Sequence, residues 1–154
     1  MMRIIATTIS NSKSEKPRSL FIQFRLPLEL WRQCEASLKS PDKKGAEAIL
    51  LDELRKNTDA LPEGRQVMFK LTLPDVADLY QPLMNHKRVA RVVALSGGYT
   101  RDDACKRLAA NHGMIASFSR ALVQDLRVSM NDAEFEEALA KSIDEISRAS
   151  TVKV

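Results

Sequence analysis

The chain is poor in the residues that mark several common protein classes. Its 154 residues include only two cysteines, Cys34 and Cys105, and neither lies in a CxxC or Cys/His pattern of the kind that binds zinc. No apolar run reaches the length of about 18 residues that a membrane-spanning helix needs. The start, MMRIIATTIS, is too short in apolar residues for a secretory signal. These absences favour a cytoplasmic protein without membrane attachment, metal ion or other cofactor.

Catalytic patterns are also lacking. The two histidines, His86 and His112, have no neighbouring cysteine or acid cluster. No GxSxG nucleophile elbow and no glycine-rich phosphate loop is present, and the Gly97-Gly98 pair is interpreted as the end of a helix. The sequence therefore predicts that the protein is not an enzyme.

The charge distribution is the most informative feature that is present. Apolar residues make up 44% and charged residues 29%, a normal globular mixture, and the net charge is +4. Residues 86–127 carry 8 basic against 3 acidic residues, whereas residues 128–154 carry 3 against 6. Because a basic surface attracts polyanions through counterion release, this pattern favours double-stranded DNA as a partner.

The first half of the sequence predicts an arm, two short strands and two helices. Residues 1–18 are interpreted as a flexible basic arm. Alternating apolar residues predict strands at 21–26 and 67–73, the second with Phe69, Leu71 and Leu73 on one face. A helix follows Pro27, and another spans 45–57 with Ala48, Leu51 or Ile49, and Leu54 inward. The segment 59–64 is the predicted linker between two small units.

The second half predicts helices throughout. HKRVARVVALS at 86–96 has apolar residues at helical spacing and is followed by the two glycines. Thr100 is a predicted N-cap for a helix over 101–110 that buries Ala104 and Leu108. After a break at 111–114, a third helix is predicted over 115–128, and Asn131 with Glu134 forms a capping box for an acidic C-terminal helix. The tail helix is expected to pack through Phe135, Leu139, Ile143 and Ile146.

Three successive helices with a basic second member are typical of a helix-turn-helix DNA-binding domain. On the third helix, three polar side chains share one face and are expected to reach bases, since arginine pairs with guanine and glutamine with adenine: Ser117, Arg120 and Gln124. The remaining predicted DNA contacts hold phosphates or lie near them: Lys87, Arg88, Thr100, Arg101, Lys106, Arg107, Asn111, His112 and Arg127.

Residues 61–128 resemble the core of the PapB-type regulators of fimbrial adhesin operons. The resemblance rests on Arg88-Val89, Gly97-Gly98, Tyr99, Thr100-Arg101, Cys105, Asn111 and Gly113 in that order. It implies a bacterial, DNA-binding transcription regulator that works as an oligomer on a plasmid or adhesin-type operon.

Residues 19–57 resemble a ribbon-helix-helix unit, in which paired strands of a dimer enter the major groove. That resemblance implies base contacts by Phe21, Gln23 and Arg25, and the alternative function of a plasmid partition or conjugative-transfer accessory protein. A protein-interaction module with an incidental basic face is a third interpretation.

The fold prediction is a mainly α protein with one or two short strands. Its predicted parts are the basic arm 1–18, a strand-helix-helix unit at 19–60 that dimerises or reads DNA, a helix-turn-helix domain at 61–130 and an acidic helix at 131–154. The predicted assembly is a homodimer or higher homo-oligomer on nucleoid DNA.

Overall fold

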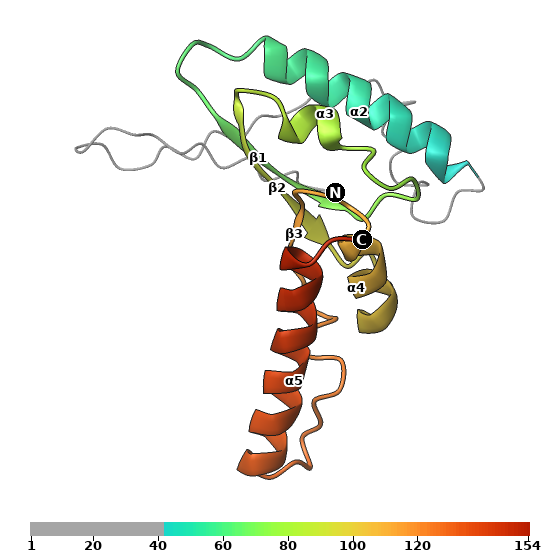
Figure 1. Cartoon of the computed structure of the whole chain (residues 1–154), viewed down its shortest axis with the longest axis vertical. Coiled ribbons are helices and arrows are strands. Elements are labelled where there is room, and N and C mark those ends of the chain that lie inside the picture. The colour runs from blue at the N-terminus through green and yellow to red at the C-terminus, as the bar shows by residue number, and fades with distance from the viewer. Residues whose placement is uncertain (1–41) are drawn as a thin grey trace. The chain divides into compact units, whose positions relative to one another are not determined.

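The computed structural model of the chain describes residues 42–154 (Figure 1). The predicted basic arm and the first predicted strand, with Phe21, Gln23 and Arg25, lie outside the described residues. The elements are α2 (Lys43–Asp59), β1 (Val67–Thr72), α3 (Gln81–Met84), β2 (Val89–Leu95), α4 (Arg101–Ala109), β3 (Ile115–Ala116) and α5 (Asp132–Thr151).

The three strands form a small parallel sheet in the order β1-β2-β3. In the pairing of β2 with β3, Val93 lies opposite Ile115 and Ala94 opposite Ala116. In chain order β1, α3, β2, α4 and β3 alternate strand with helix, which is typical of parallel α/β folds. The described part of the chain is therefore mixed α/β. The prediction of helices with short strands is confirmed in part, but the strands form a sheet and the helices do not form the predicted helix-turn-helix arrangement.

The segment predicted as the first helix of that domain is strand β2. Its sequence, VARVVAL, has three β-branched valines, and it pairs with a neighbour on each side. A central parallel strand is covered on both faces, so its apolar residues run almost without alternation and imitate helical spacing. Gly97-Gly98 accordingly follows a strand and does not end a helix.

The predicted helix over 115–128 is also absent from the structure. Ile115 and Ala116 pair with β2 as strand β3, and turns occupy most of the positions from Ser119 to Asp125. Phe118 and Ala121 are buried on this irregular backbone, whereas Leu122 and Leu126 are half-buried. Pairing with β2 outweighs local helical preference here, which is a tertiary effect that spacing alone does not reveal.

The described chain divides into two compact units, which we treat separately. In the first unit, residues 42–70 and 74–92, α2 contacts α3 and the core includes Leu54, Phe69, Tyr80 and Leu83. The β1 prediction is confirmed, because residues alternate between buried and half-buried along the strand. Helix α2 is confirmed with Leu54 inward, although Ala48, expected inside, is exposed.

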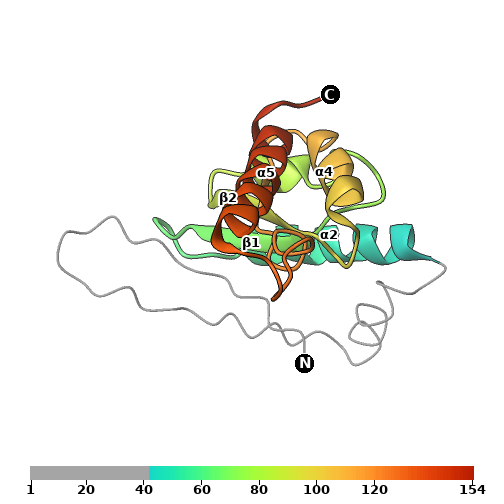
Figure 2. The same ribbon diagram turned by 90° about the horizontal axis from the view of Figure 1, so that it is seen from below.

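The second unit comprises residues 71–73 and 93–154. In it α4 and α5 lie side by side (Figures 1 and 2). Ala104 and Leu108 of α4 are fully buried, as predicted, together with Met114. The Thr100 N-cap is confirmed, since its hydroxyl accepts a hydrogen bond from the Asp103 N–H at 3.3 Å.

Helix α5 begins with the predicted capping box. The Asn131 side chain accepts from the Glu134 N–H, and the Glu134 carboxylate accepts from the Asn131 N–H, both at 3.0 Å. The predicted packing face is wrong in part, because Phe135 and Ile143 are 42% and 51% exposed while Ser142 and Ala149 are buried. Between residues 42 and 154, no helix is both long and apolar enough to cross a membrane.

Candidate functional site

Two loops of the second unit follow the carboxyl ends of neighbouring parallel strands. The first, Ser96–Thr100, follows β2, and the second, Ser117–Arg120, follows β3. Because β2 and β3 run parallel, both loops leave the same edge of the sheet. In parallel α/β folds ligands bind at this edge. We call these two segments the carboxyl-edge loops.

The first loop is a tight turn built on two glycines. The Tyr99 N–H donates to the Ser96 carbonyl at 3.1 Å, and the central residues Gly97 and Gly98 have φ values of 64° and 85°. Positive φ at both central positions is the pattern of a type I′ turn. Among residues 42–154, nothing accepts a hydrogen bond from the N–H of Gly97 or Gly98. Backbone N–H groups presented by such a turn are suited to bind an anion.

Packing also requires the first of these glycines. A Cβ added to Gly97 would lie 2.5 Å from the Cγ2 methyl of Thr72, so no side chain fits without a shift. At Gly98 a Cβ would meet nothing within 4 Å. The backbone at Gly98 is therefore open, which leaves room for a ligand to approach it.

The second loop contributes an exposed arginine. Ser119 and Arg120 are both exposed, and in the described part of the chain the Arg120 guanidinium has no ion-pair or hydrogen-bond partner. The loop begins from a fixed point, because the Ser117 N–H donates to the Ala94 carbonyl at 2.8 Å and Phe118 is buried. An unpaired guanidinium can bind a phosphate through two parallel hydrogen bonds.

Arg101, at the start of α4, holds the surrounding segments together. Its side chain is 6% exposed and makes ion pairs with Asp125 and with Glu145, and it donates to the Ser142 hydroxyl at 2.8 Å. The Gln124 side chain accepts from the backbone N–H of Arg101 at 2.8 Å. Burial opposes the charge of Arg101, but the hydrogen bonds to Asp125 and Glu145 outweigh it and raise the pKa of the guanidinium.

Tyr99, the residue after the two glycines, stacks with Arg107 of α4. The Arg107 guanidinium lies over the Tyr99 ring, 4.2 Å from its centre. This cation–π contact connects the residue after Gly98 to the body of α4. A Cβ on Gly97 would lie near both Thr72 and the Tyr99 ring, so the turn contacts both of these side chains.

In the first unit, one lysine stands out. Lys70 lies on β1, and the other lysines of the described chain lie in helices, turns or the C-terminal tail. It is half-buried, on the strand face opposite Phe69 and Leu71, and two residues before the carboxyl end of the strand. Its amine makes no hydrogen bond or ion pair within residues 42–154. Sequence reasoning missed Lys70, although a lysine inside an apolar strand that ends at a proline was a usable signal.

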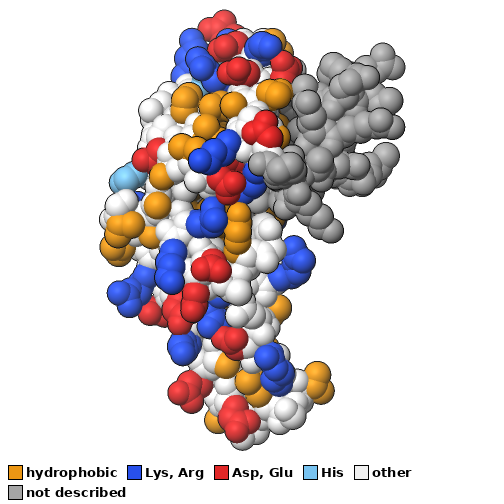
Figure 3. All heavy atoms as spheres, turned by 90° about the vertical axis from the view of Figure 1, so that its right-hand side faces the viewer, with side chains coloured by type: hydrophobic (Ala, Val, Ile, Leu, Met, Phe, Trp, Pro, Cys, Tyr) orange, Lys and Arg blue, Asp and Glu red, His pale blue; other side chains and the backbone are white. Residues whose placement is uncertain are grey.

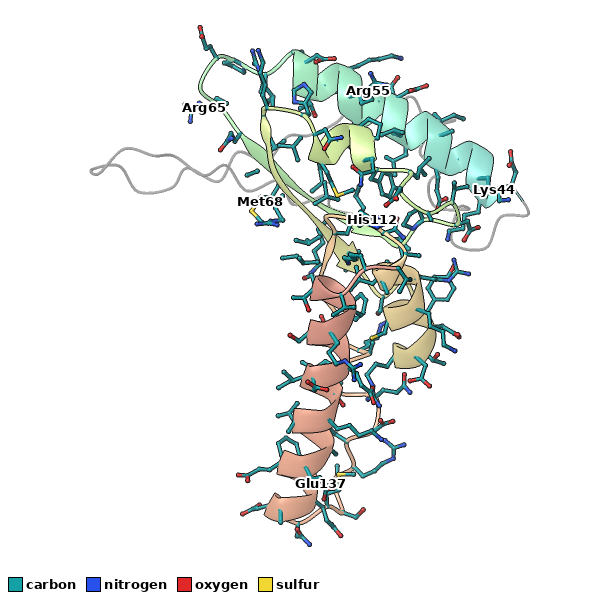
Figure 4. All side chains as sticks on the ribbon, in the orientation of Figure 1. Lys44, Arg55, Arg65, Met68, His112 and Glu137 are labelled. Carbon is teal, nitrogen blue, oxygen red and sulfur yellow. The ribbon has the colours of Figure 1, made fainter. Side chains whose placement is uncertain are left out.

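The residues predicted to bind DNA have other surroundings in the structure. Arg101 is buried in its ion pairs, Gln124 accepts from the Arg101 backbone, and Arg127 donates to the carbonyls of Gln124 and Leu126. Thr100 is an N-cap, and Asn111 is buried and donates to the Arg107 carbonyl at 2.7 Å. Arg107 stacks on Tyr99, and Ser117 and Arg88 are half-buried. Thr100, Gln124 and Arg127 are exposed, as are the remaining predicted contacts: Lys87, Lys106, Arg120 and His112, the last in the turn between α4 and β3 (Figure 4).

Ser117, Arg120, Gln124 and Arg127 do not share a recognition helix, since the predicted helix over 115–128 is absent. Figure 3 shows basic and acidic side chains interspersed on one face of the molecule, without a patch of a single sign. The basic surplus of residues 86–127 is partly neutralised at Arg101, whose partner Glu145 belongs to the acidic helix α5. Charge counted along the sequence misses such pairing.

Metal and thiol chemistry have little support in the described residues. Within 42–154 no group of three or more His, Cys, Asp or Glu side chains is arranged to hold a metal ion. Burial raises the pKa of the Cys105 thiol, which keeps it protonated and unreactive near neutral pH.

No family model matches this chain, but it is similar to characterised enzymes. Over 116 residues, 75% of its length, it is 47% identical to proteins named fructose-bisphosphate aldolase class 1 from Synechocystis and from Porphyromonas gingivalis. It is 45% identical to a protein of the same name from Clostridium acetobutylicum over the same length. The match covers 39% of each relative, so the chain spans about two fifths of their length.

This similarity corrects the functional prediction. At 45–47% identity the relatives are aldolases, so the resemblance to PapB-type regulators is wrong, and with it the predicted DNA partner and transcriptional role. The expectation of a protein that is not an enzyme is contradicted as well. The PapB comparison rested on scattered single residues and on Gly97-Gly98, a pair that the turn after β2 also requires for its positive φ values.

Proposed function

We propose that this chain carries part of the active site of a class 1 fructose-bisphosphate aldolase. The observation that carries the proposal is 47% identity over 116 residues to proteins of that name. The carboxyl-edge loops and Lys70 supply residue types that the reaction needs. Because the chain spans 39% of the relatives' length, we assign to it imine formation and the binding of one phosphate, and no more. A cytoplasmic location belongs to this proposal, but nucleoid association does not.

Lys70 is the proposed nucleophile. A lysine amine attacks the ketone carbon of a ketose bisphosphate, and loss of water leaves a protonated imine. The carbon next to the imine carbon is bonded to a further carbon that bears a hydroxyl group. This carbon–carbon bond breaks as that hydroxyl loses its proton. Its electron pair passes into the imine to form an enamine, and an aldehyde phosphate departs. Protonation and hydrolysis of the enamine release the ketone phosphate and regenerate the amine.

The carboxyl-edge loops are the proposed phosphate site. The Gly97 and Gly98 N–H groups and the Arg120 guanidinium are unpaired donors on loops that share one edge of the sheet. Backbone N–H groups together with an arginine bind a phosphate dianion by charge-assisted hydrogen bonds. In parallel barrels the loops after consecutive strands serve this purpose.

Imine formation can be tested by trapping. The full chain is incubated with dihydroxyacetone phosphate, borohydride reduces any imine to a stable secondary amine, and peptide mass spectrometry locates the adduct. We expect the adduct on Lys70, its loss in Lys70→Met, and its persistence in Lys87→Met, where an exposed lysine is removed. Absence of an adduct from every lysine of the parent chain, or an adduct that survives in Lys70→Met, contradicts the assignment of Lys70.

The phosphate site can be tested separately by calorimetric titration of inorganic phosphate. We expect Arg120→Gln to weaken binding at least about tenfold, the effect of losing a charge-assisted hydrogen-bond pair. Arg91→Gln, at an exposed position in β2, is the matched control and should bind like the parent. Equal affinity in all three proteins would rule out Arg120 as a phosphate ligand.

A further inference from the structure

We propose that Arg101 is a positioning residue that holds the Ser117–Arg120 loop in its phosphate-binding conformation through Gln124 and Asp125. The inference rests on the proposed function, because it takes the carboxyl-edge loops as the phosphate site. It assigns to Arg101 no contact with the ligand.

Arg101 bonds to two adjacent residues of the segment that follows β3. Its backbone N–H donates to the Gln124 side chain at 2.8 Å, and its guanidinium pairs with the carboxylate of Asp125. The remaining nitrogens of the same side chain are directed to α5, one to Glu145 and one to the Ser142 hydroxyl. Since α4 and α5 pack together, the anchor for the loop is rigid.

The segment needs such an anchor because its own backbone bonding is sparse. Turns dominate from Ser119 to Asp125, and the backbone bonds there are long, at 3.3 Å from the Val123 N–H to the Ser119 carbonyl and 3.2 Å from the Leu126 N–H to the Val123 carbonyl. Upstream, the loop is held where the Ser117 N–H bonds to Ala94. Ser119 and Arg120 lie between this point and the Arg101 anchor.

Holding both ends of a short loop restricts the positions of the residues between them. An exposed arginine on an unrestrained loop loses conformational freedom when it binds a phosphate, which lowers its affinity. The bonds from Arg101 restrict the loop before the ligand arrives, so less conformational freedom is lost on binding. Breaking these bonds therefore weakens phosphate binding although no contact with the phosphate is lost. Lysine cannot replace Arg101, because an ammonium group lacks the planar, three-directional donor geometry.

The test combines phosphate affinity with hydrogen exchange in the full chain. Asp125→Asn and Arg101→Lys are compared with Asp144→Asn and Arg148→Lys, which make the same types of change at exposed positions on α5. All are studied at a temperature where circular dichroism shows them folded. We expect the dissociation constant for inorganic phosphate to rise about three- to tenfold in the first pair only. We also expect faster amide exchange across residues 119–126 than in α5.

The possible outcomes separate this inference from the proposed function. If Arg120→Gln abolishes phosphate binding while Asp125→Asn and Arg101→Lys bind phosphate like the parent, the site stands and the positioning role is wrong. If Arg120→Gln has no effect, the phosphate site itself is wrong, and the positioning role is lost with it. Faster exchange spread evenly over the whole molecule in Asp125→Asn would indicate general destabilisation and would overturn the inference.

Discussion

Gly97 lies directly against Thr72, so that a Cβ on Gly97 would come within 2.5 Å of the Thr72 Cγ2 methyl. The turn after β2 is thus packed onto the end of β1 and cannot accept a side chain at this position. The next residue, Gly98, has an equally positive φ but open space around it. A substitution at Gly98 therefore tests the cost of the positive φ alone, whereas one at Gly97 tests that cost together with the steric clash.

We expect Gly97→Ala to destabilise the protein by about 2–4 kcal/mol, from the left-handed backbone and the clash together. Gly98→Ala should cost only about 1–2 kcal/mol, from the backbone alone. Adding Thr72→Ser, which removes the Cγ2 methyl, should recover part of the loss in Gly97→Ala and none in Gly98→Ala. Urea unfolding measures each value, and equal costs for the two glycine variants would contradict the packing argument.

The capping box at the start of α5 predicts a local stability effect. Asn131→Ala removes the acceptor for the Glu134 N–H and should lower the free energy of unfolding by about 1 kcal/mol. Asn131→Ser, which can still cap the helix, should stay within a few tenths of the parent. A loss of similar size in Asn131→Ser would show that Asn131 acts through something other than its cap.

The ion pair of Asp125 with Arg101 predicts a pH dependence. The hydrogen bond from Arg101 lowers the pKa of Asp125, so protonation is harder in the folded chain than in the unfolded one. The pair therefore contributes stability above the ordinary aspartate pKa of about 3.9, and the contribution disappears as the pH falls through the lowered value.

We expect the stability difference between the parent and Asp125→Asn to be constant near neutral pH and to shrink on acidification below about pH 4. Urea unfolding at a series of pH values measures it, with the exposed Asp144→Asn as control. A difference that persists unchanged down to about pH 2 would show that the charge of Asp125 is not the source of the effect.

The C-terminal tail makes an unusual set of contacts in the second unit. The Lys153 ammonium donates to the carbonyls of Leu108, Met114 and Ala149, each at 2.9 Å, which joins the ends of α4 and α5 to the residue before β3. Lys153→Met should cost about 1–3 kcal/mol, since three acceptors lose a charged donor. Lys106→Met, at an exposed position on α4, should stay within about 0.5 kcal/mol of the parent. A Lys153→Met protein as stable as this control would contradict the importance of the contacts.

Elements with strong local signals were predictable. β1, with its period of two, and α5, with Asn131 and Glu134 at capping-box spacing, formed as expected. The α4 prediction also held, since the Thr100 cap and the buried Ala104 and Leu108 all act within a few residues of one another. In each case the predictive signal lies inside the element, in a cap or in the alternation of apolar residues, although β1 also needs its pairing with β2.

The candidate site was less accessible from the sequence. Gly97-Gly98 was recognised as a stop, but whether a strand or a helix precedes it depends on neighbours far away in the chain. Arg101 and Gln124 look like ordinary exposed polar residues in a linear pattern, yet they bond to each other across 23 positions. Lys70 was not predicted as a site residue, although its place within an apolar strand that precedes a proline is a local signal.

Local sequence alone thus dictated where α4 and α5 begin, which face of β1 is apolar and that the chain turns at Gly97-Gly98, because caps, alternation and positive φ are properties of neighbouring residues. Tertiary pairing decided that residues 89–95 and 115–116 are strands, since the paired residues of β2 and β3 lie more than 20 positions apart in the chain. Tertiary packing also decided that Arg101 is buried in ion pairs and that Arg120 has no ion-pair partner among residues 42–154. That choice depends on where the acidic groups of α5 come to lie, and spacing along the chain does not encode it.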